Sequence, residues 1–344
     1  MAKEKVQKIT SQNIQAARPR DVDEVRAQGT GAVAAQFVRE LFSLHRQEWG
    51  NLWGYVFIAP AVLMYLVFQA WPILRGLFMA FSDYRWIVRE THGWAGFNGL
   101  DNWIEMFQDG TFWHSFWIAL KFSLIVTPIT LILSLTTAVL ISQIRNGLLA
   151  GTYRVIAYLP VILPISVAML VWAKLFDFQF GYLNVLLQAV GVENPPNWLG
   201  SPSTALYAMA MPTVWSRFGS WTLLFIIGIY NINREIYEAA RVDGANGWRQ
   251  FLHMTMPLLK PVFVLVLVLG SGVVSATEES MILFQGTTGG PAESALTTGV
   301  YLYRIAFIHG DMRMGYAATM SLFLGLVNML ITLVVFKTLQ TERA

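Results

Sequence analysis

Residues 231–261, NINREIYEAARVDGANGWRQFLHMTMPLLKP, are the most informative segment of this sequence. Its first half mixes apolar and charged residues at helical spacing, and Gly244 and Gly247 predict that this helix stops in a tight turn. A second short helix can follow before Pro257 and Pro261 lead into the next apolar run. The stretch therefore predicts a compact knob, made of two short helices joined at a glycine.

Apolar runs long enough to cross a membrane lie on both sides of the knob. A hydrocarbon core needs about 20 apolar residues of helix. The sequence offers six such runs, at residues 53–81, 116–141, 155–175, 205–230, 262–284 and 315–336. Only 13% of the residues are charged and the mean hydropathy is +0.49, as expected for a chain that lipid partly solvates. We therefore predict an all-α integral membrane protein, a bundle of six spans.

The composition also argues against several kinds of function. The net charge of +3 includes no Lys/Arg cluster that could follow a phosphate backbone, so we expect no nucleic-acid partner. Cysteine is absent, and the five histidines have no spacing suited to a metal. Neither a G-x-x-x-x-G-K-[ST] phosphate loop nor a G-x-S-x-G element is present. We expect neither catalytic residues nor metal ligands, and energy for any active process must come from another chain.

The distribution of basic residues predicts the orientation of the spans. Cytoplasmic loops of membrane proteins carry an excess of Lys and Arg. In an even-span topology one side would hold Lys3, Lys5, Lys8, Arg18, Arg20, Arg26, Arg39, Arg46, Arg145, Arg154, Arg234, Arg241, Arg249, Lys260, Lys337 and Arg343. The other side has few basic residues and many acids. Both termini and the knob are therefore predicted to be cytoplasmic.

The chain divides into five predicted segments. Residues 1–32 are polar and read as a mobile cytoplasmic tail. Residues 33–52 keep one helical face apolar, which suits either a helix on the inner membrane surface or an extension of the first span. Residues 53–115 form the first span and an outer loop, residues 116–338 form the core with the knob at 231–259, and residues 339–344 form a second tail.

The knob resembles the EAA motif of permease subunits of binding-protein-dependent ABC importers. In that motif Glu-Ala-Ala is followed by Asp-Gly-Ala and, about a dozen residues later, by proline. The matching positions here are Glu238, Ala239, Ala240, Asp243, Gly244, Ala245 and Pro257. In that family the loop is a coupling helix that docks in a cleft of the ATPase subunit. The resemblance therefore implies that residues 231–259 bind an ATPase.

Three further segments, at residues 96–116, 154–192 and 287–291, are similar to the carbohydrate-uptake branch of the family. Within that branch the chain resembles the first of two permeases, of the maltose and glycerol-phosphate type. This implies a sugar or oligosaccharide substrate, a bacterial inner-membrane location and a second homologous permease. It also implies an ABC ATPase dimer that holds ATP and Mg, so that this chain needs no cofactor. An extracytoplasmic sugar-binding protein would dock on residues 97–113 and 289–304.

Three ionisable residues lie inside predicted spans, where charge is costly and calls for a partner or water. They are Arg217, Glu278 and Glu279. With nearby polar and aromatic side chains they are candidates for contact with sugar hydroxyls. These neighbours are Trp215, Ser216, Ser220 and Ser275. The alternative is a structural ion pair between Arg217 and one glutamate.

Two other functions stay open at this stage. Because Arg217 is positively charged, an importer of the same architecture for glycerol-phosphate or an acidic oligosaccharide is an alternative. A more remote alternative is a multispan enzyme that acts on lipid-linked sugars. Such an enzyme needs acidic residues with metal or phosphate ligands near one membrane face, whereas the outer acids here are scattered along the sequence.

Overall fold

The computed structural model describes residues 54–272 and 276–340. The predictions for residues 1–32 and 33–52 lie outside this range. The chain divides into two compact units, Met1–Leu74 and Arg75–Ala344. The described residues are helical apart from turns, loops and one isolated β-bridge, between Ser82 and Phe97. The predicted all-α class is confirmed.

The first span is a helix from Gly54 to Met79. It contains a π-helical turn, η1 (Leu66–Ala70), which continues into α4 (Trp71–Met79). Pro72 is the second residue after the π-turn and has no N–H to donate to the preceding turn. The Trp71 N–H bonds to Leu66 O instead, which is the wider hydrogen bond of a π-helix. The helix therefore changes its pitch beside Pro72 and does not end there.

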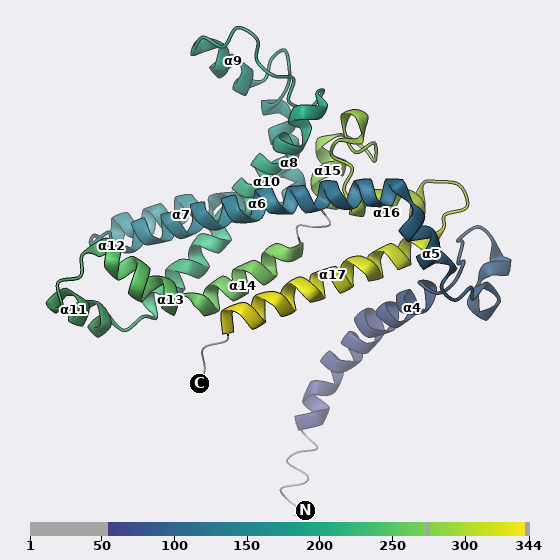
Figure 1. The fold of residues 1–344 in the computed structure, drawn as a ribbon, viewed down its shortest axis with the longest axis horizontal. Helices are drawn as coiled ribbons and strands as arrows, with labels where there is room; N and C mark the ends of the chain where they lie inside the picture. The colour runs from purple at the N-terminus through teal and green to yellow at the C-terminus, as the bar shows by residue number, and fades with distance from the viewer. Residues whose placement is uncertain (1–53, 273–275, 341–344) are drawn as a thin grey trace, which may run out of the picture. The chain divides into compact units, whose positions relative to one another are not determined.

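Three long helices form the frame of the second unit: α6 (Gly110–Ser142), α10 (Pro202–Tyr230) and α17 (Met314–Gln340). Helix α10 packs mainly along α6 and α7 (Gly147–Ile162), and α17 packs along α14 (Lys260–Ser271) (Figure 1). Buried side chains of α6, α10 and α14, including Trp221, Phe225 and Val266, make one of the cores. The predicted spans at 116–141, 205–230 and 315–336 each correspond to one of the three long helices.

The other two predicted spans are broken helices. Helices α7 and α8 (Ile165–Leu175) meet at an angle of 92°. The residue before a proline is driven out of the helical region, and Leu163, which precedes Pro164, has an extended backbone at φ −79° and ψ 129°. The predicted span at 262–284 is likewise divided into α14 and α15 (Thr277–Leu283). Ala276, which precedes α15, lies in the left-handed region with φ 34°.

The predicted six-span count is not reproduced as such. Within residues 54–272 and 276–340, three helices are long and apolar enough to cross a membrane, or up to five if each bent pair is one span. Helix α10 has 29 residues but is not among the three. Its centre carries Arg217 and several hydroxyl side chains, which lower its hydropathy.

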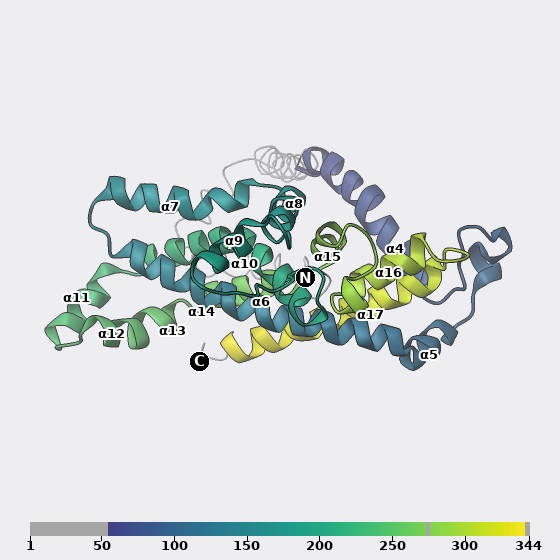
Figure 2. The same cartoon turned by 90° about the horizontal axis from the view of Figure 1, so that it is seen from above.

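The loops that were predicted to share one side lie at one end of the second unit. Figures 1 and 2 both place α11 (Arg234–Val242), α12 (Gly247–Gln250) and α13 (Met256–Leu258) at the end where α6 turns into α7. Helices α5 (Asp101–Gln108) and α16 (Thr298–Phe307) lie at the opposite end. The remaining short elements are η2 (Arg89–Thr91), η3 (Gly93–Gly96), α9 (Tyr182–Ala189), η4 (Phe251–Thr255) and η6 (Pro291–Glu293).

Asp109 holds the α5 and α16 end together. Its side chain caps α6 by accepting the N–H groups of Thr111 and Phe112. The hydroxyls of Tyr301 and Tyr316 donate to its other oxygen, Oδ2, at 2.6 and 2.8 Å. One carboxylate therefore joins the start of α6 to α16 and α17.

Two arginines on loops strengthen the same end. Arg313 donates two hydrogen bonds to Glu105 at 2.6 Å, and this carboxylate raises the pKa of Arg313. Arg85 pairs with Asp83 and Asp311, and hydrogen bonds to these acids raise its pKa in the same way. Acids that were scattered along the sequence are thus partners in a network between residues 83–109 and 301–316.

Gly219 sets the close contact between α10 and α7. A Cβ at this position would lie 2.3 Å from the carbonyl oxygen of Ala157 and 2.9 Å from Cα of Tyr158. These are backbone atoms of another helix, which cannot rotate away as a side chain can. Only glycine therefore allows the two helices to approach this closely.

We expect Gly219→Ala to lower the free energy of unfolding by about 1–3 kcal/mol, because α7 must move away from α10. Gly325→Ala in α17 is a matched control, since a Cβ there meets no atom within 4 Å. It should change stability by less than about 1 kcal/mol and in the stabilising direction. Thermal unfolding of the purified protein in detergent measures both, and equal midpoints would contradict the packing argument.

Candidate functional site

The knob is a helix–turn–helix whose turn depends on Gly244. Helix α11 ends in a Schellman arrangement, in which the N–H of Ala245 bonds to Ala240 O at 2.8 Å and that of Gly244 bonds to Arg241 O at 3.0 Å. This arrangement requires a left-handed residue, and Gly244 has φ +78°. The prediction that the first helix of the knob ends in a turn at Gly244 is confirmed.

Side-chain hydrogen bonds fix the second half of the knob against the first. Asn246 caps α12 by accepting the N–H of Arg249. The hydroxyls of Tyr237 and Thr255 are 2.9 Å apart, and Gln250 Nε2 donates to Ala245 O at 2.9 Å. The chain continues through the π-turn η4 into α13, where Pro257 is again the second residue after a π-turn. The knob is therefore a packed unit that can transmit a displacement.

Most residues of the EAA match lie on the surface of the knob. Ala240 is buried, and Glu238 is exposed and pairs with Arg234 at 3.2 Å. The sequence analysis did not single out Val242 and Trp248, whose exposed fractions are 88% and 66%. The sequence did contain a signal for them, because both are large apolar side chains in a mostly polar loop. The exposed positions of the match are Glu238, Ala239, Asp243, Gly244 and Pro257.

A second candidate site is a polar cavity of about 450 Å³ at the middle of α10. It lies where α10 passes the start of α8 and the start of α15. Both neighbouring helices begin there because their spans are broken at that level. The lining residues are Leu163, Ile165, Ser216, Arg217, Thr277, Glu278 and Glu279.

An ion pair crosses the cavity wall between α10 and α15. Arg217 Nη2 donates to Glu279 Oε1 at 3.3 Å. The Glu279 side chain is 7% exposed, whereas that of Arg217 is 31% exposed. A buried carboxylate needs a compensating charge, and Arg217 supplies it while keeping part of its guanidinium open to the cavity. The structural ion pair weighed from the sequence is present, and it does not exclude contact of Arg217 with a solute.

The structure brings together four of the seven predicted contact residues. Ser216, Arg217, Glu278 and Glu279 line the polar cavity, and Glu278 is exposed there. Ser220 is not among the lining residues, and its hydroxyl donates to the backbone oxygen of Arg217 at 2.9 Å. Ser275 lies outside the described residues. Direct sugar contact by any of these residues stays a prediction.

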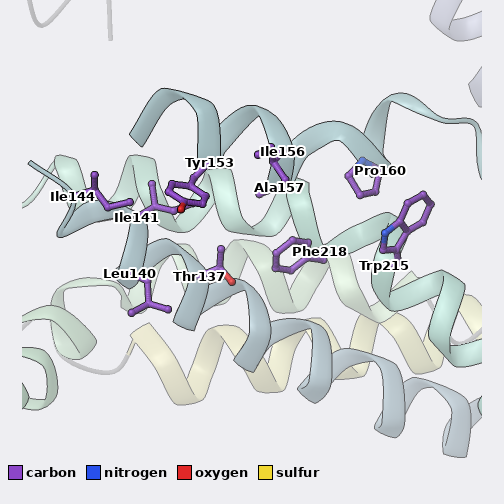
Figure 3. A pocket seen from close by; sticks show the side chains of 10 residues that line it. All are labelled: Thr137, Leu140, Ile141, Ile144, Tyr153, Ile156, Ala157, Pro160, Trp215 and Phe218. Carbon is purple, nitrogen blue, oxygen red and sulfur yellow. The ribbon is translucent and has the colours of Figure 1, made fainter. Parts of the chain in front are cut away.

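Trp215 lies in a neighbouring groove of about 570 Å³ between α6, α7 and α10 (Figure 3). Of the lining residues, Thr137 alone is neither apolar nor aromatic, and none is charged. Groove and cavity are lined from the same two segments of the chain, since Trp215 directly precedes Ser216 on α10 and Pro160 lies three residues before Leu163 at the α7 bend. The groove extends from there to Ile144, near the turn between α6 and α7.

Neither site has the residues of a metal centre. Among residues 54–272 and 276–340, no group of three or more His, Cys, Asp or Glu side chains is placed to hold a metal ion. The chemistry that the cavity offers is hydrogen bonding and charge, from one guanidinium, two carboxylates and two hydroxyl residues.

Comparison with known proteins identifies relatives over most of the chain. The profile of the family described as "Binding-protein-dependent transport system inner membrane component" matches residues 130–337. The probable ABC transporter permease protein YesP of Bacillus subtilis is 34% identical over 84% of this chain and 90% of its own. The trehalose/maltose transport system permease protein MalF of Thermococcus litoralis is 30% identical over 78% of this chain and 88% of its own.

The fold is also similar to that of a solved structure. A chain of a bacterial ABC transporter involved in the import of the acidic polysaccharide alginate superposes with a TM-score of 0.74. The match covers 89% of this chain and all of that one, at 22% sequence identity. At this identity the likeness concerns the fold alone.

We expect Glu279→Gln to destabilise the chain by about 1–2 kcal/mol, because Arg217 loses its buried counterion. The loss is smaller than for a fully buried pair, since solvent reaches Arg217. Arg217→Met combined with Glu279→Gln should recover most of the loss. Glu278→Gln at the exposed neighbour is the matched control and should have little effect on stability. The yield and thermal midpoint of the purified protein report the outcome, and additive losses in the double variant would exclude an energetic pair.

Proposed function

The chain belongs to the family of inner membrane components of binding-protein-dependent transport systems, and we propose that it forms half of the translocation path of an ATP-driven sugar or oligosaccharide importer. It is a multi-pass membrane protein by this membership. The observation that carries the solute proposal is the polar cavity at the middle of α10. Charged groups at that depth in a membrane protein line solute paths or pair with each other, and this cavity has one ion pair and a further, exposed carboxylate.

The chemistry of the cavity and groove suits a sugar. Sugars present hydroxyls around their rings and apolar C–H groups on their faces. Carboxylates, a guanidinium and serine or threonine hydroxyls of the cavity can form hydrogen bonds with the sugar hydroxyls. Tyr153, Trp215 and Phe218 in the neighbouring groove can pack against the C–H groups. We assign the cavity and the groove to the outer and inner parts of one path, and the relatives named above include a trehalose/maltose permease.

The knob is the proposed docking site for the ATPase. It connects directly to α10, because α10 ends at Tyr230 and α11 begins at Arg234. Exposed Trp248 supplies an aromatic anchor of the kind that dominates protein interfaces, and exposed Val242 adds apolar surface. ATP and Mg would be held by the partner ATPase, and this chain would act without a cofactor or enzymatic activity of its own.

The end formed by α5 and α16 is the proposed docking surface for an extracytoplasmic binding protein. Residues 97–113 and 289–304 were assigned to this role from the sequence, and Asp109 and Arg304 stabilise them. Asp109 accepts the Tyr301 hydroxyl at 2.6 Å, and Arg304 pairs with Glu293 at 2.6 Å. A second permease would complete the path. In this arrangement both termini and the knob are cytoplasmic.

An importer of glycerol-phosphate or of an acidic oligosaccharide is a second candidate function. Arg217 is the residue that favours it, since a guanidinium binds phosphate and carboxylate well. In the structure that guanidinium already bonds to Glu279, and Glu278 adds a second acid to the cavity. We therefore rank this candidate below an uncharged sugar.

We expect Gly244→Trp to uncouple ATP hydrolysis from uptake, because a side chain at φ +78° is strained and the second half of the knob must reorient. Gly244→Asn is the matched control, because asparagine tolerates the left-handed conformation, and it should retain coupling. Sugar uptake per ATP hydrolysed, in vesicles with all subunits, is the measurement, and normal coupling in Gly244→Trp would contradict the assignment.

We expect cysteine at position 247 to be protected from an impermeant thiol reagent in intact cells, and cysteine at position 101 to react. Both positions are exposed at opposite ends of the second unit, and the natural chain contains no cysteine. Permeabilised cells provide the control, because both cysteines should then be labelled. The reverse pattern in intact cells would place the knob outside and remove the ATPase proposal.

A further inference from the structure

We infer that Glu278 makes this half of the path selective against negatively charged solutes, so that the transported sugar is uncharged. The inference rests on the proposed function and narrows its substrate class. It starts from the charges of the polar cavity. One guanidinium, of Arg217, faces two carboxylates, of Glu278 and Glu279, which leaves a formal excess of one negative charge in the lining.

The two carboxylates have different roles because they are differently placed. Glu279 is buried against Arg217, so the charges of these two groups largely cancel. Glu278 is exposed at the cavity, and no ion pair of this residue is seen in the described part of the chain. The field that a solute meets in the cavity is therefore dominated by the carboxylate of Glu278.

The groove beyond the cavity points to the same solute. Its ten lining residues include no charged side chain. A carboxylate or phosphate on the solute would leave water there without a counterion, which is costly. An uncharged sugar loses less, because Tyr153 and Trp215 present aromatic faces to its C–H groups. Cavity and groove thus disfavour an anion by two independent effects, repulsion and desolvation.

The repulsion between Glu278 and an anionic solute can be expressed as a ratio of uptake rates. Two like charges about 7 Å apart, at an effective dielectric constant of about 20–40, change an equilibrium by roughly ten- to fiftyfold. We expect Glu278→Gln to raise the uptake of an anionic sugar relative to a neutral one by about this factor. Glu278→Lys reverses the charge and should raise the ratio further.

The experiment compares a neutral oligosaccharide with the same oligosaccharide oxidised to a uronate at one ring. Uptake of each is measured in vesicles that contain the whole importer, with the binding protein saturated by sugar. The ratio of uronate to neutral uptake in a variant is divided by that in the unaltered importer, which cancels the selectivity of the binding protein. Glu193→Gln is the matched control, since Glu193 is exposed and outside the cavity lining, and it should leave the ratio unchanged.

The possible outcomes test the inference about Glu278 separately from the proposed function. A ratio that rises in Glu278→Gln and again in Glu278→Lys, but not in Glu193→Gln, supports the inference. An unchanged ratio in Glu278→Lys, or a preference for the uronate in the unaltered importer, overturns it while leaving a sugar importer in place. Failure of the unaltered importer to take up any sugar contradicts the proposed function itself.

Discussion

Backbone hydrogen bonding is the constraint on which this structure depends. In lipid each N–H and C=O group must find a partner inside the protein, so spans are helices and departures from the helix need a local solution. This chain departs at two kinds of place. Beside Pro72 and Pro257 the helix widens to a π-turn, and at Leu163 and Ala276 it breaks altogether. The polar cavity lies between the two breaks, where α8 and α15 begin.

The sequence predicted those features that depend on neighbouring residues. Apolar runs located the helices, the glycine at position 244 located the turn of the knob, and its spacing from the EAA residues indicated the family. The 92° bend between α7 and α8 was not predicted, although Pro164 was visible. Proline also occurs inside α6 and α10 without dividing them. Which proline ends a helix depends on packing against distant segments, here α15 against α8, and a single sequence does not contain that information.

The candidate site was predictable as a set of residue types but not as an arrangement. The cost of charge inside a span identified Arg217, Glu278 and Glu279. Which glutamate pairs with Arg217 depends on the direction in which α15 leaves the break at Ala276, because adjacent residues on a helix point about 100° apart. Ser220 was predicted as a contact residue but does not line the cavity. Its hydroxyl bonds instead to the backbone of its own helix, as serine hydroxyls on helices often do.

Helix α10 carries Arg217 at its middle and leads into the knob at its end, which gives it the geometry of a lever arm. The 13 residues from Arg217 to the end of α10 at Tyr230 correspond to roughly 20 Å at the helical rise. If the knob end is displaced so that α10 tilts by about 10°, points that far apart shift by about 3.5 Å relative to each other. That shift exceeds the slack of a 3.3 Å contact. A tilt that moves Arg217 by this amount relative to Glu279 would therefore open the link between them and expose a second carboxylate to the path.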